Sequence, residues 1–191
     1  QSQLMGWIQQ DAARALFAGA GKNYAALVEA AKHKGFKAVP LGVKASVSWT
    51  NTIRRQASKN VVGILPGTAK PDEIVMYSAH WDHLGHCDAV KGDDICNGAV
   101  DNATGVAGLV ALAEASVKAG PATRSQVFLA VTGEESGLLG SKYYAENPVY
   151  PLARTVGGVN MDGLNIIGKT KDFVLIGAGK SELEDMVKPL V

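Results

Sequence analysis

Four segments of the chain place a histidine or a carboxylate directly after an apolar run or directly before a helical pattern. Because ligands bind at the carboxyl ends of strands in α/β sheets, side chains in such places are expected to meet at one edge. Gathered carboxylates repel one another unless cations neutralise them. A mixture of histidine and carboxylate suits zinc, which takes nitrogen and oxygen ligands. The residues are His80, Asp82, Asp101, Glu134, Glu135 and Asp162.

The spacing of these residues predicts a division of roles. Asp82 lies two positions after His80, so it can accept a hydrogen bond from the imidazole nitrogen that does not hold the metal. Of the adjacent pair Glu134 and Glu135, one can bind metal while the other takes a proton from a metal-bound water. A single carboxylate can bridge two metals held ~3.5–4 Å apart. Taken alone, each residue also has an ordinary structural interpretation, such as a helix N-cap for Asp101; the shared context favours the metal site.

Short apolar strands alternate with helices from residue 60 onward, which indicates an α/β sheet covered on both faces. The expected strands are residues 61–65, 74–79, 126–131, 156–160 and 173–176. The expected helices are residues 104–118, 136–146 and one starting at a capping box formed by Ser181 and Glu184. Residues 84–100 show no periodicity and are expected to form a loop.

The first 58 residues are expected to form a separate connecting segment with two helices and one strand. The helical patterns cover residues 2–18 and 23–35, and loose alternation over residues 39–49 predicts the strand. Residues 59–191 would then form the core. The chain opens at Gln1 with neither an initiator Met nor a signal peptide, which is expected of a processed chain or of a fragment.

Composition excludes several classes of partner. The 191 residues include 19 Lys and Arg against 18 Asp and Glu, for a net charge of +1. This balance argues against nucleic acid or an anionic membrane as the main partner. No apolar run approaches the ~18 residues that a membrane span needs. The two cysteines, Cys87 and Cys96, can form a local disulfide or remain two free thiols.

The four segments, taken in order over residues 60 to about 179, resemble the M28 family of co-catalytic zinc peptidases, which includes bacterial aminopeptidases and glutamate carboxypeptidase. The segments that carry the resemblance are His80-x-Asp82-His83-Leu84-Gly85, Gly98-Ala99-x-Asp101-Asn102-Ala103-x-Gly105, Gly133-Glu134-Glu135-x-Gly137-Leu138-x-Gly140-Ser141 and Asn160-x-Asp162. The resemblance implies a three-layer α/β/α sandwich with a mixed, mostly parallel central sheet of about eight strands. Fewer strands than that are expected here, so the sheet is expected to be incomplete in this chain.

The resemblance also implies a pair of zinc ions and assigns their ligands. His80 and Asp162 would bind one zinc, and Glu135 would bind the other. Asp101 would bridge both, and the peptide bond that follows it, to Asn102, would be cis.

The catalytic roles that the resemblance implies belong to Glu134 and Asp82. Glu134 would be the general base that takes a proton from the metal-bridging water and passes it to the leaving amine, and Asp82 would orient His80. The implied function is a zinc-dependent exopeptidase, with an aminopeptidase favoured. Two alternatives stay open: a zinc acyltransferase of the same fold, such as a glutaminyl cyclase, and a non-catalytic receptor-like module that has lost its metals.

The chain departs from the family pattern at the second zinc. The family takes a terminal histidine for that zinc from a late loop, whereas the last histidine here is His86. Both His83 and His86 are interpreted as surface residues or as neighbours of the ligands, so the second site is expected to lack its terminal histidine. We therefore expect the chain to be the N-terminal part of a catalytic domain, weakly active or inactive alone. The implied substrate is a peptide, and the expected location is the periplasm or outside the cell; the preferred side chain and the oligomeric state stay open.

Overall fold

The computed structural model describes residues 6–171, 174, 176, 179, 181–187 and 189, and it divides the chain into two units. The first unit is Gln1–Arg54 and the second is Arg55–Val191. Each is described by itself below. The assignment of residues 1–58 as a connecting segment stays a prediction.

The first unit contains two short helices, α1 (Gln10–Gly19) and α2 (Tyr24–Ala31). Asn23 caps α2 by accepting a hydrogen bond from the Ala26 amide at 3.0 Å. Neither helix has a buried residue. The strand expected over residues 39–49 is wrong, because residues 36–60 form neither helix nor strand. An extended segment becomes a strand only when a neighbouring segment satisfies its backbone groups, and no described strand pairs with this one.

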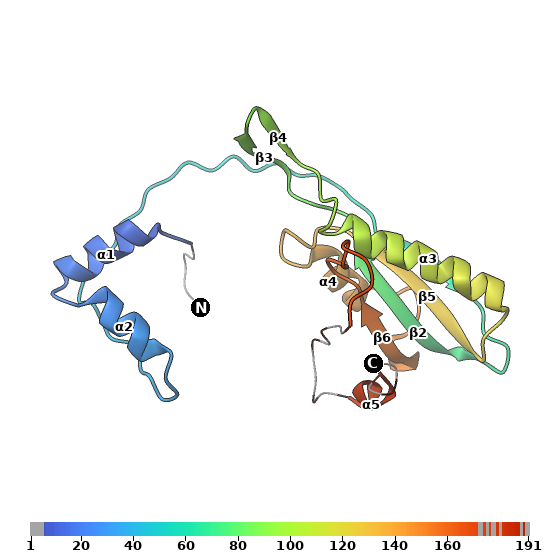
Figure 1. The fold of residues 1–191 in the computed structure, drawn as a ribbon. Coiled ribbons are helices and arrows are strands. Elements are labelled where there is room, and N and C mark those ends of the chain that lie inside the picture. The colour runs from blue at the N-terminus through green and yellow to red at the C-terminus, as the bar shows by residue number, and fades with distance from the viewer. Residues whose placement is uncertain are drawn as a thin grey trace. The chain divides into compact units, whose positions relative to one another are not determined.

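The second unit is built on a four-stranded sheet with the order β1-β5-β2-β6. Its strands are β1 (Val61–Leu65), β2 (Lys70–His80), β5 (Arg124–Val131) and β6 (Thr155–Asn160). β2 pairs in parallel with both β5 and β6, while β1 is antiparallel to β5. The sheet is therefore mixed and mostly parallel, as expected, and β2 lies in its interior (Figure 1).

Two helices cover the opposite faces of this sheet. α3 (Ala103–Ala119) packs along one face, where its Leu109 contacts Phe128 (Figure 1). α4 (Leu139–Glu146) covers the other face, where Tyr144 packs against Leu129. Phe128 and Leu129 are neighbours in β5, so the alternation of side chains along a strand supplies both layers of the core. The result is a three-layer α/β/α arrangement.

Residues 84–100, expected to be a loop, instead contain a hairpin of β3 (Gly85–Val90) and β4 (Asp93–Cys96). Its tip, Lys91-Gly92, has positive φ at both positions, the conformation that tight two-residue hairpins use. The expectation failed because nearly all residues of the hairpin are exposed, so no apolar alternation marks it. Cys87 and Cys96 form a disulfide across the hairpin, which settles the alternatives left open by the sequence.

The last described elements are short. A 3₁₀ turn (Leu152–Arg154) precedes β6, and α5 (Leu183–Val187) is the last described helix. The Glu184 side chain accepts a hydrogen bond from the Gly179 amide, so the capping box with Ser181 stays a prediction. The strand expected over residues 173–176 lies partly outside the described residues. Within the part of the chain that the structure describes, no helix has both the length and the apolar character needed to cross a membrane.

Candidate metal centre

His80 is the last residue of β2, and the sheet holds its ring in a fixed orientation. The side chain is only 2% exposed. Its Nδ1 lies 3.0 Å from the main-chain carbonyl oxygen of Asp82. A carbonyl oxygen can only accept a hydrogen bond, so Nδ1 must carry the proton. In the neutral ring, Nε2 then carries a lone pair and is free to bind a cation.

That Nε2 atom faces two carboxylates. It lies 3.1 Å from Oδ1 of Asp101 and 3.3 Å from Oδ1 of Asp162. Burial alone would lower the pKa of His80, but the hydrogen bond to the Asp82 carbonyl and the negative charge of Asp162 outweigh it, so the pKa is raised. Three electron-pair donors thus converge on one point. The arrangement is stable only when a proton or a metal cation lies between them.

A second group of donors adjoins the first. His83 Nδ1 lies 2.6 Å from Oε1 of Glu135, and Asp101 is again within reach. We call His80, Asp101 and Asp162 the first cluster, and His83, Asp101 and Glu135 the second cluster. Within each cluster one ligand atom per residue lies within 4.8 Å of the others. Asp101 belongs to both clusters, which is what its predicted bridging role requires.

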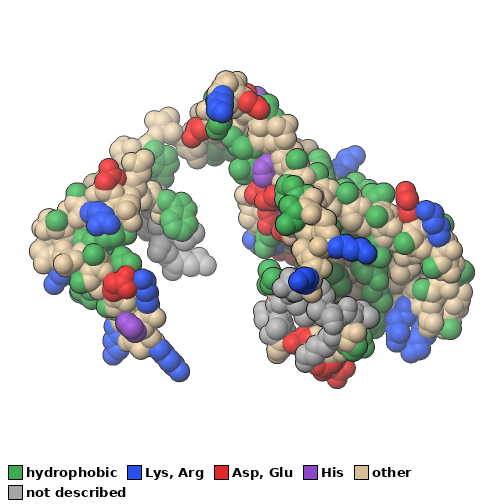
Figure 2. Space-filling model, in the orientation of Figure 1, with side chains coloured by type: hydrophobic (Ala, Val, Ile, Leu, Met, Phe, Trp, Pro, Cys, Tyr) green, Lys and Arg blue, Asp and Glu red, His purple; other side chains and the backbone are tan. Residues whose placement is uncertain are grey.

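The donor atoms fit a divalent cation. His83 Nδ1 and Glu135 Oε1 are buried, yet neither makes a hydrogen bond. In the described part of the chain, none of the three carboxylates in the two clusters forms an ion pair with Lys or Arg. Acidic side chains gather beside a histidine on the visible face of the second unit (Figure 2). The set of nitrogen and oxygen donors, lacking a basic partner, is the chemistry that zinc prefers.

The two residues expected to be catalytic, Asp82 and Glu134, lie next to the first cluster. The Glu134 amide donates to Oδ1 of Asp82 at 3.2 Å. Glu134 is half-buried, and its charge is among those that raise the pKa of His80. The Asp82 carboxylate is 3.9 Å from Nδ1 of His80, farther than the Asp82 carbonyl oxygen. The structure thus brings all six predicted residues into one region, and the roles assigned to them stay predictions.

Asn102 joins the two segments that carry Asp101 and Asp162, a role that sequence reasoning missed. The peptide bond between Asp101 and Asn102 is cis, as the family resemblance implies. Asn102 is 2% exposed, and its side-chain amide donates to the Met161 carbonyl at 3.0 Å. Its Oδ1 accepts from the amides of Gly105 and Gly163 at 3.0 and 3.1 Å. An asparagine at a helix N-cap was the available signal, but the contacts beyond its own helix depend on the fold.

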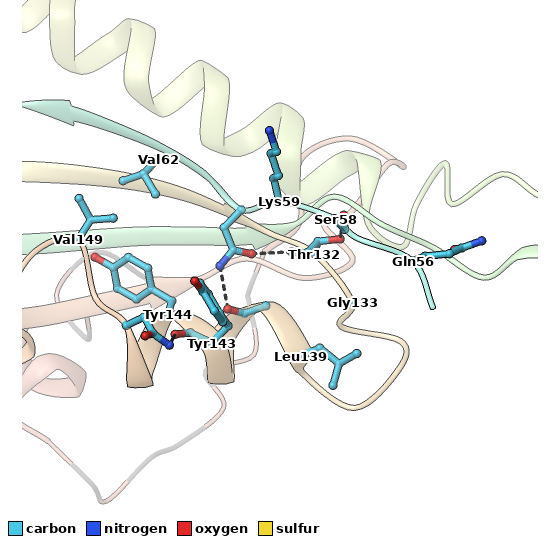
Figure 3. Close-up of a pocket in the computed structure, with 13 residues that line it drawn as sticks. Gln56, Ser58, Lys59, Val62, Thr132, Gly133, Leu139, Tyr143, Tyr144 and Val149 are labelled. Carbon is cyan, nitrogen blue, oxygen red and sulfur yellow. Dashed lines mark hydrogen bonds between the residues drawn. The ribbon is translucent and has the colours of Figure 1, made fainter. Parts of the chain in front are cut away.

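Asn60 has a similar function for the loop that carries Glu134 and Glu135. Its Oδ1 accepts from the Thr132 amide at 3.1 Å, and its side-chain amide donates to the Gly140 carbonyl at 2.8 Å. The two ends of the loop are thereby held together; these bonds are among the dashed lines in Figure 3, where one of them ends at Thr132. Asn60 also lines a cavity of about 560 Å³ on the α4 side of the sheet. No residue of either cluster lines that cavity.

The two remaining histidines of the motif region differ in position. His86 lies in β3 with its side chain 80% exposed, and it pairs with Asp94 at 3.2 Å. His83 is 21% exposed and belongs to the second cluster. The His-x-x-His spacing of His80 and His83 was the only sequence signal for this placement, and it does not distinguish a ligand from a surface residue.

An α/β sheet that carries two donor clusters sharing one carboxylate is typical of hydrolases that use two metals. Residues 60–191 match Peptidase family M28, and the chain belongs to this family of zinc metallopeptidases.

Several curated proteins are similar to the chain over part of its length. It is 33% identical over 129 residues to mouse (Mus musculus) "Aminopeptidase NAALADL1", covering 64% of the chain and 16% of that protein. It is 36% identical over 111 residues to a "Probable zinc metalloprotease" of Pyricularia oryzae, covering 58% and 21%. A "Glutamate carboxypeptidase 2 homolog" of Caenorhabditis elegans is 31% identical over 127 residues, covering 63% and 15%. The chain thus spans 15% to 21% of the length of these relatives.

A solved structure is also similar to the chain. It is "Aminopeptidase from Aneurinibacillus sp. strain AM-1", with 29% identity and a TM-score of 0.42 over 55% of this chain and 24% of that one.

Proposed function

We propose that this protein is a zinc-dependent exopeptidase and that it removes residues from the amino terminus of peptides. The observation that carries the proposal is the position of Asp101, whose carboxylate belongs to both donor clusters. The names of the relatives support it, since they include an aminopeptidase and a probable zinc metalloprotease. A carboxypeptidase is the alternative that the third relative represents.

The residues of the two clusters would hold the metal pair. His80 and Asp162 would hold the first zinc, Glu135 the second, and Asp101 would contact both. When bound, the zinc pair would supply an acidified water and positive charge for the carbonyl oxygen of the substrate. The Asp82 carbonyl accepts the Nδ1 proton of His80, so the neutral ring presents the lone pair of Nε2 to the first position.

Glu134 would move the proton during hydrolysis. Its own carbonyl accepts hydrogen bonds from the amides of Gly137 and Leu138, both at 2.9 Å, and its amide donates to Asp82. These bonds fix the backbone of Glu134 beside the first cluster. Its carboxylate would accept a proton from the attacking water and deliver it to the departing amine.

The variant Glu134→Gln tests this role, with Glu114→Gln on the exposed side of α3 as the matched control. Loss of the general base should lower turnover of an aminoacyl p-nitroanilide by about 10²- to 10⁴-fold. Zinc content, measured by elemental analysis, should stay unchanged, and the control should match the wild type in both assays. Unchanged turnover in Glu134→Gln, or loss of zinc together with activity, would contradict the proposed role.

The choice of substrate separates the exopeptidase from its alternatives. An aminopeptidase should cleave a peptide with a free amino terminus and leave its acetylated form intact. A carboxypeptidase should cleave the acetylated peptide and leave intact a peptide whose carboxyl terminus is blocked. Cyclisation of an amino-terminal glutamine without hydrolysis would indicate an acyltransferase. Absence of both turnover and bound zinc would indicate a receptor-like module.

We also propose that the protein is exported to the periplasm or secreted. The Cys87–Cys96 disulfide supports this, because disulfides persist in oxidising compartments. Cell fractionation of the tagged protein would test it, and recovery from the reducing cytosol with free thiols would overturn it.

A further inference from the structure

The Cys87–Cys96 disulfide lies in the β3–β4 hairpin, whose two ends lead directly to the donor clusters. We propose that this disulfide is a redox-sensitive device. When it is closed, it holds the segment that carries Asp101 in place for metal binding; when it is reduced, the affinity for the metal falls. The inference rests on the proposed zinc centre and adds a means of regulating it.

Apart from the disulfide, little holds the hairpin in shape. All residues of β3 and β4 other than the two cysteines are exposed, and Val90 and Ile95 are 70% and 44% exposed. No hairpin residue belongs to either hydrophobic core cluster of the described chain. The ladder is also irregular between His86 and Val90, and Cys87 falls within that irregular part. A small element without an apolar core depends on its crosslink, which limits the conformations open to the chain.

The segment that leaves the hairpin extends the constraint to Asp101. Gly98 follows Cys96 by two residues and has a φ of +65°. A Cβ added to Gly98 would lie 2.7 Å from Cβ of His83 and 2.9 Å from the Asp101 carbonyl oxygen. The Gly98 carbonyl also accepts a hydrogen bond from the Ala103 amide at 2.9 Å, which ties it to the first turn of α3. Because this backbone is so closely packed, a shift of Cys96 would also displace Asp101, the carboxylate that both clusters share.

A small cavity adjoins both the hairpin base and the candidate metal centre. Its volume is about 260 Å³, and its lining includes Cys96 from β4, Asp82 and His83 from the segment after β2, and Asn102. Both cysteines are half-buried rather than enclosed in a core. One open space thus borders the disulfide and the residues around the clusters, so a small reductant has a route to the hairpin base.

The switching step is thiol–disulfide exchange with a dithiol. One thiolate of the dithiol attacks a sulfur of the Cys87–Cys96 bond, forms a mixed disulfide and releases the other cysteine as a thiolate that takes up a proton. The second thiol of the dithiol then displaces the remaining cysteine. The protein gains two thiols, and the dithiol becomes a disulfide. In a reducing compartment the metal centre would therefore be loosely held, and oxidation after export would complete it.

The redox state and metal binding must affect each other by the same factor, which gives a test that does not require activity. We expect opening of the disulfide to weaken zinc binding by at least about tenfold. Bound zinc should then lower the equilibrium constant for reduction by the same factor, a shift of about 30 mV for a two-electron couple. Equilibration of the protein in glutathione redox buffers, with and without a fixed concentration of free zinc, measures that shift.

The double variant Cys87→Ser/Cys96→Ser tests the open state without thiols that could themselves bind zinc. Its zinc affinity, measured by competition with a chromogenic chelator, should be at least about tenfold weaker than that of the oxidised wild type. The wild type reduced with tris(2-carboxyethyl)phosphine should lose affinity in the same direction. His86→Ser is the matched control in the hairpin, since its side chain is 80% exposed, and it should keep wild-type affinity.

Ser125→Ala controls for a general loss of stability. The Ser125 hydroxyl donates to the Pro71 carbonyl at 2.6 Å and accepts from the Gly67 amide at 3.0 Å, at the amino ends of the strands. Its removal should lower the midpoint of thermal unfolding but leave zinc affinity at the wild-type value, because these bonds lie at the opposite end of the sheet from the clusters.

The outcomes separate this inference from the proposed function. Equal zinc affinity in the oxidised wild type and the double variant would overturn the inference and leave the zinc centre standing, as would a reduction equilibrium that zinc does not alter. A loss of affinity in Ser125→Ala as large as that in the double variant would also overturn it, since the effect would then reflect stability alone. Absence of bound zinc in the oxidised wild type would instead overturn the proposed function itself.

Discussion

The two ends of the central sheet handle acidic side chains in opposite ways. At the amino ends of the strands, Glu73 lies 2.6 Å from Nε of Arg124 and 3.1 Å from Nζ of Lys70. In the same region Asp72 lies 2.5 Å from Arg154. Each of these carboxylates has a basic partner within the protein.

At the carboxyl ends, the carboxylates of the two clusters meet histidines and one another. Lys70 lowers the pKa of Glu73 at the amino end, and Arg124 adds to the effect, so that end is neutralised internally. At the carboxyl end no Lys or Arg pairs with the cluster carboxylates among the described residues. The carboxylates at the amino ends are thus neutralised by basic side chains of the protein, whereas those at the carboxyl ends have no such partner among the described residues and would be neutralised by the proposed metal ions.

The largest expected effect is that of Asp101→Ala, which removes the only residue shared by both clusters. Turnover should fall by more than about 10⁴-fold, exceeding the loss of the general base alone. Bound zinc should also fall at both positions, as measured by elemental analysis. Retention of both ions would contradict the proposed difference between the two ends of the sheet, since metal binding at the carboxyl ends of the strands would then not depend on a bridging carboxylate.

Removal of zinc by a chelator should destabilise the protein, because the two donor clusters at the carboxyl ends of the strands would lose their cations. At zinc concentrations of about 100 times the dissociation constant, the bound ion stabilises the folded state by about 2.7 kcal/mol. For a domain of this size the midpoint of thermal unfolding should drop by roughly 5–10 °C on chelation. Calorimetry with and without zinc measures this, and an unchanged midpoint would show that the clusters do not bind the ion.

Asn102→Ala should have an intermediate effect, because it removes the hydrogen bonds that hold the Asp101 and Asp162 segments together. Burial of the unpaired Met161 carbonyl should cost about 1–3 kcal/mol in the free energy of unfolding. Urea unfolding measures that loss, and zinc titration should show weaker binding at the first cluster. Full affinity for zinc in a destabilised variant would show that the clusters are placed without Asn102.

The smallest expected effect is that of Glu73→Gln at the amino end. Zinc content and turnover should stay at wild-type values, and the exposed ion pair should contribute little to stability. The pKa of Glu73 is lowered from its ordinary value of 4.5, so the pairing stabilises the fold above that pH and is lost as the pH falls through the lowered value. Urea unfolding of both proteins at neutral and acidic pH checks this: the variant should be slightly weaker at neutral pH, and the difference should vanish in acid. A large loss of zinc in Glu73→Gln would remove the distinction between the two ends.

Prediction from the sequence worked best where local patterns carry the information. The apolar run before His80 predicted a strand over residues 74–79, which lies within β2, and the helix after Asp101 begins at Ala103, within one residue of the expected start. It failed for the exposed β3–β4 hairpin, whose residues show no apolar alternation, and for residues 39–49, which alternate but have no partner strand among the described residues.

Prediction of the candidate site also succeeded for residues with a local signal and failed for residues whose partners are distant in the chain. The predicted ligands were recognisable because each carries its own chemistry and stands at the end of an element. Asn60 and Asn102 were missed because their importance lies in partners about 60 to 80 residues away in the chain. An asparagine that joins two loops has the same local sequence signature as one that caps a helix.

The sequence by itself determined which donor atoms the protein offers and which strands and helices carry them, because residue type and periodicity are local properties. Only the tertiary structure decided that Asp101 is shared, that Nε2 of His80 faces two carboxylates, and that His83 lies against Glu135. Those relations arise where three parallel strands and the hairpin base end together, and the distances between residues far apart in the chain are set there by packing.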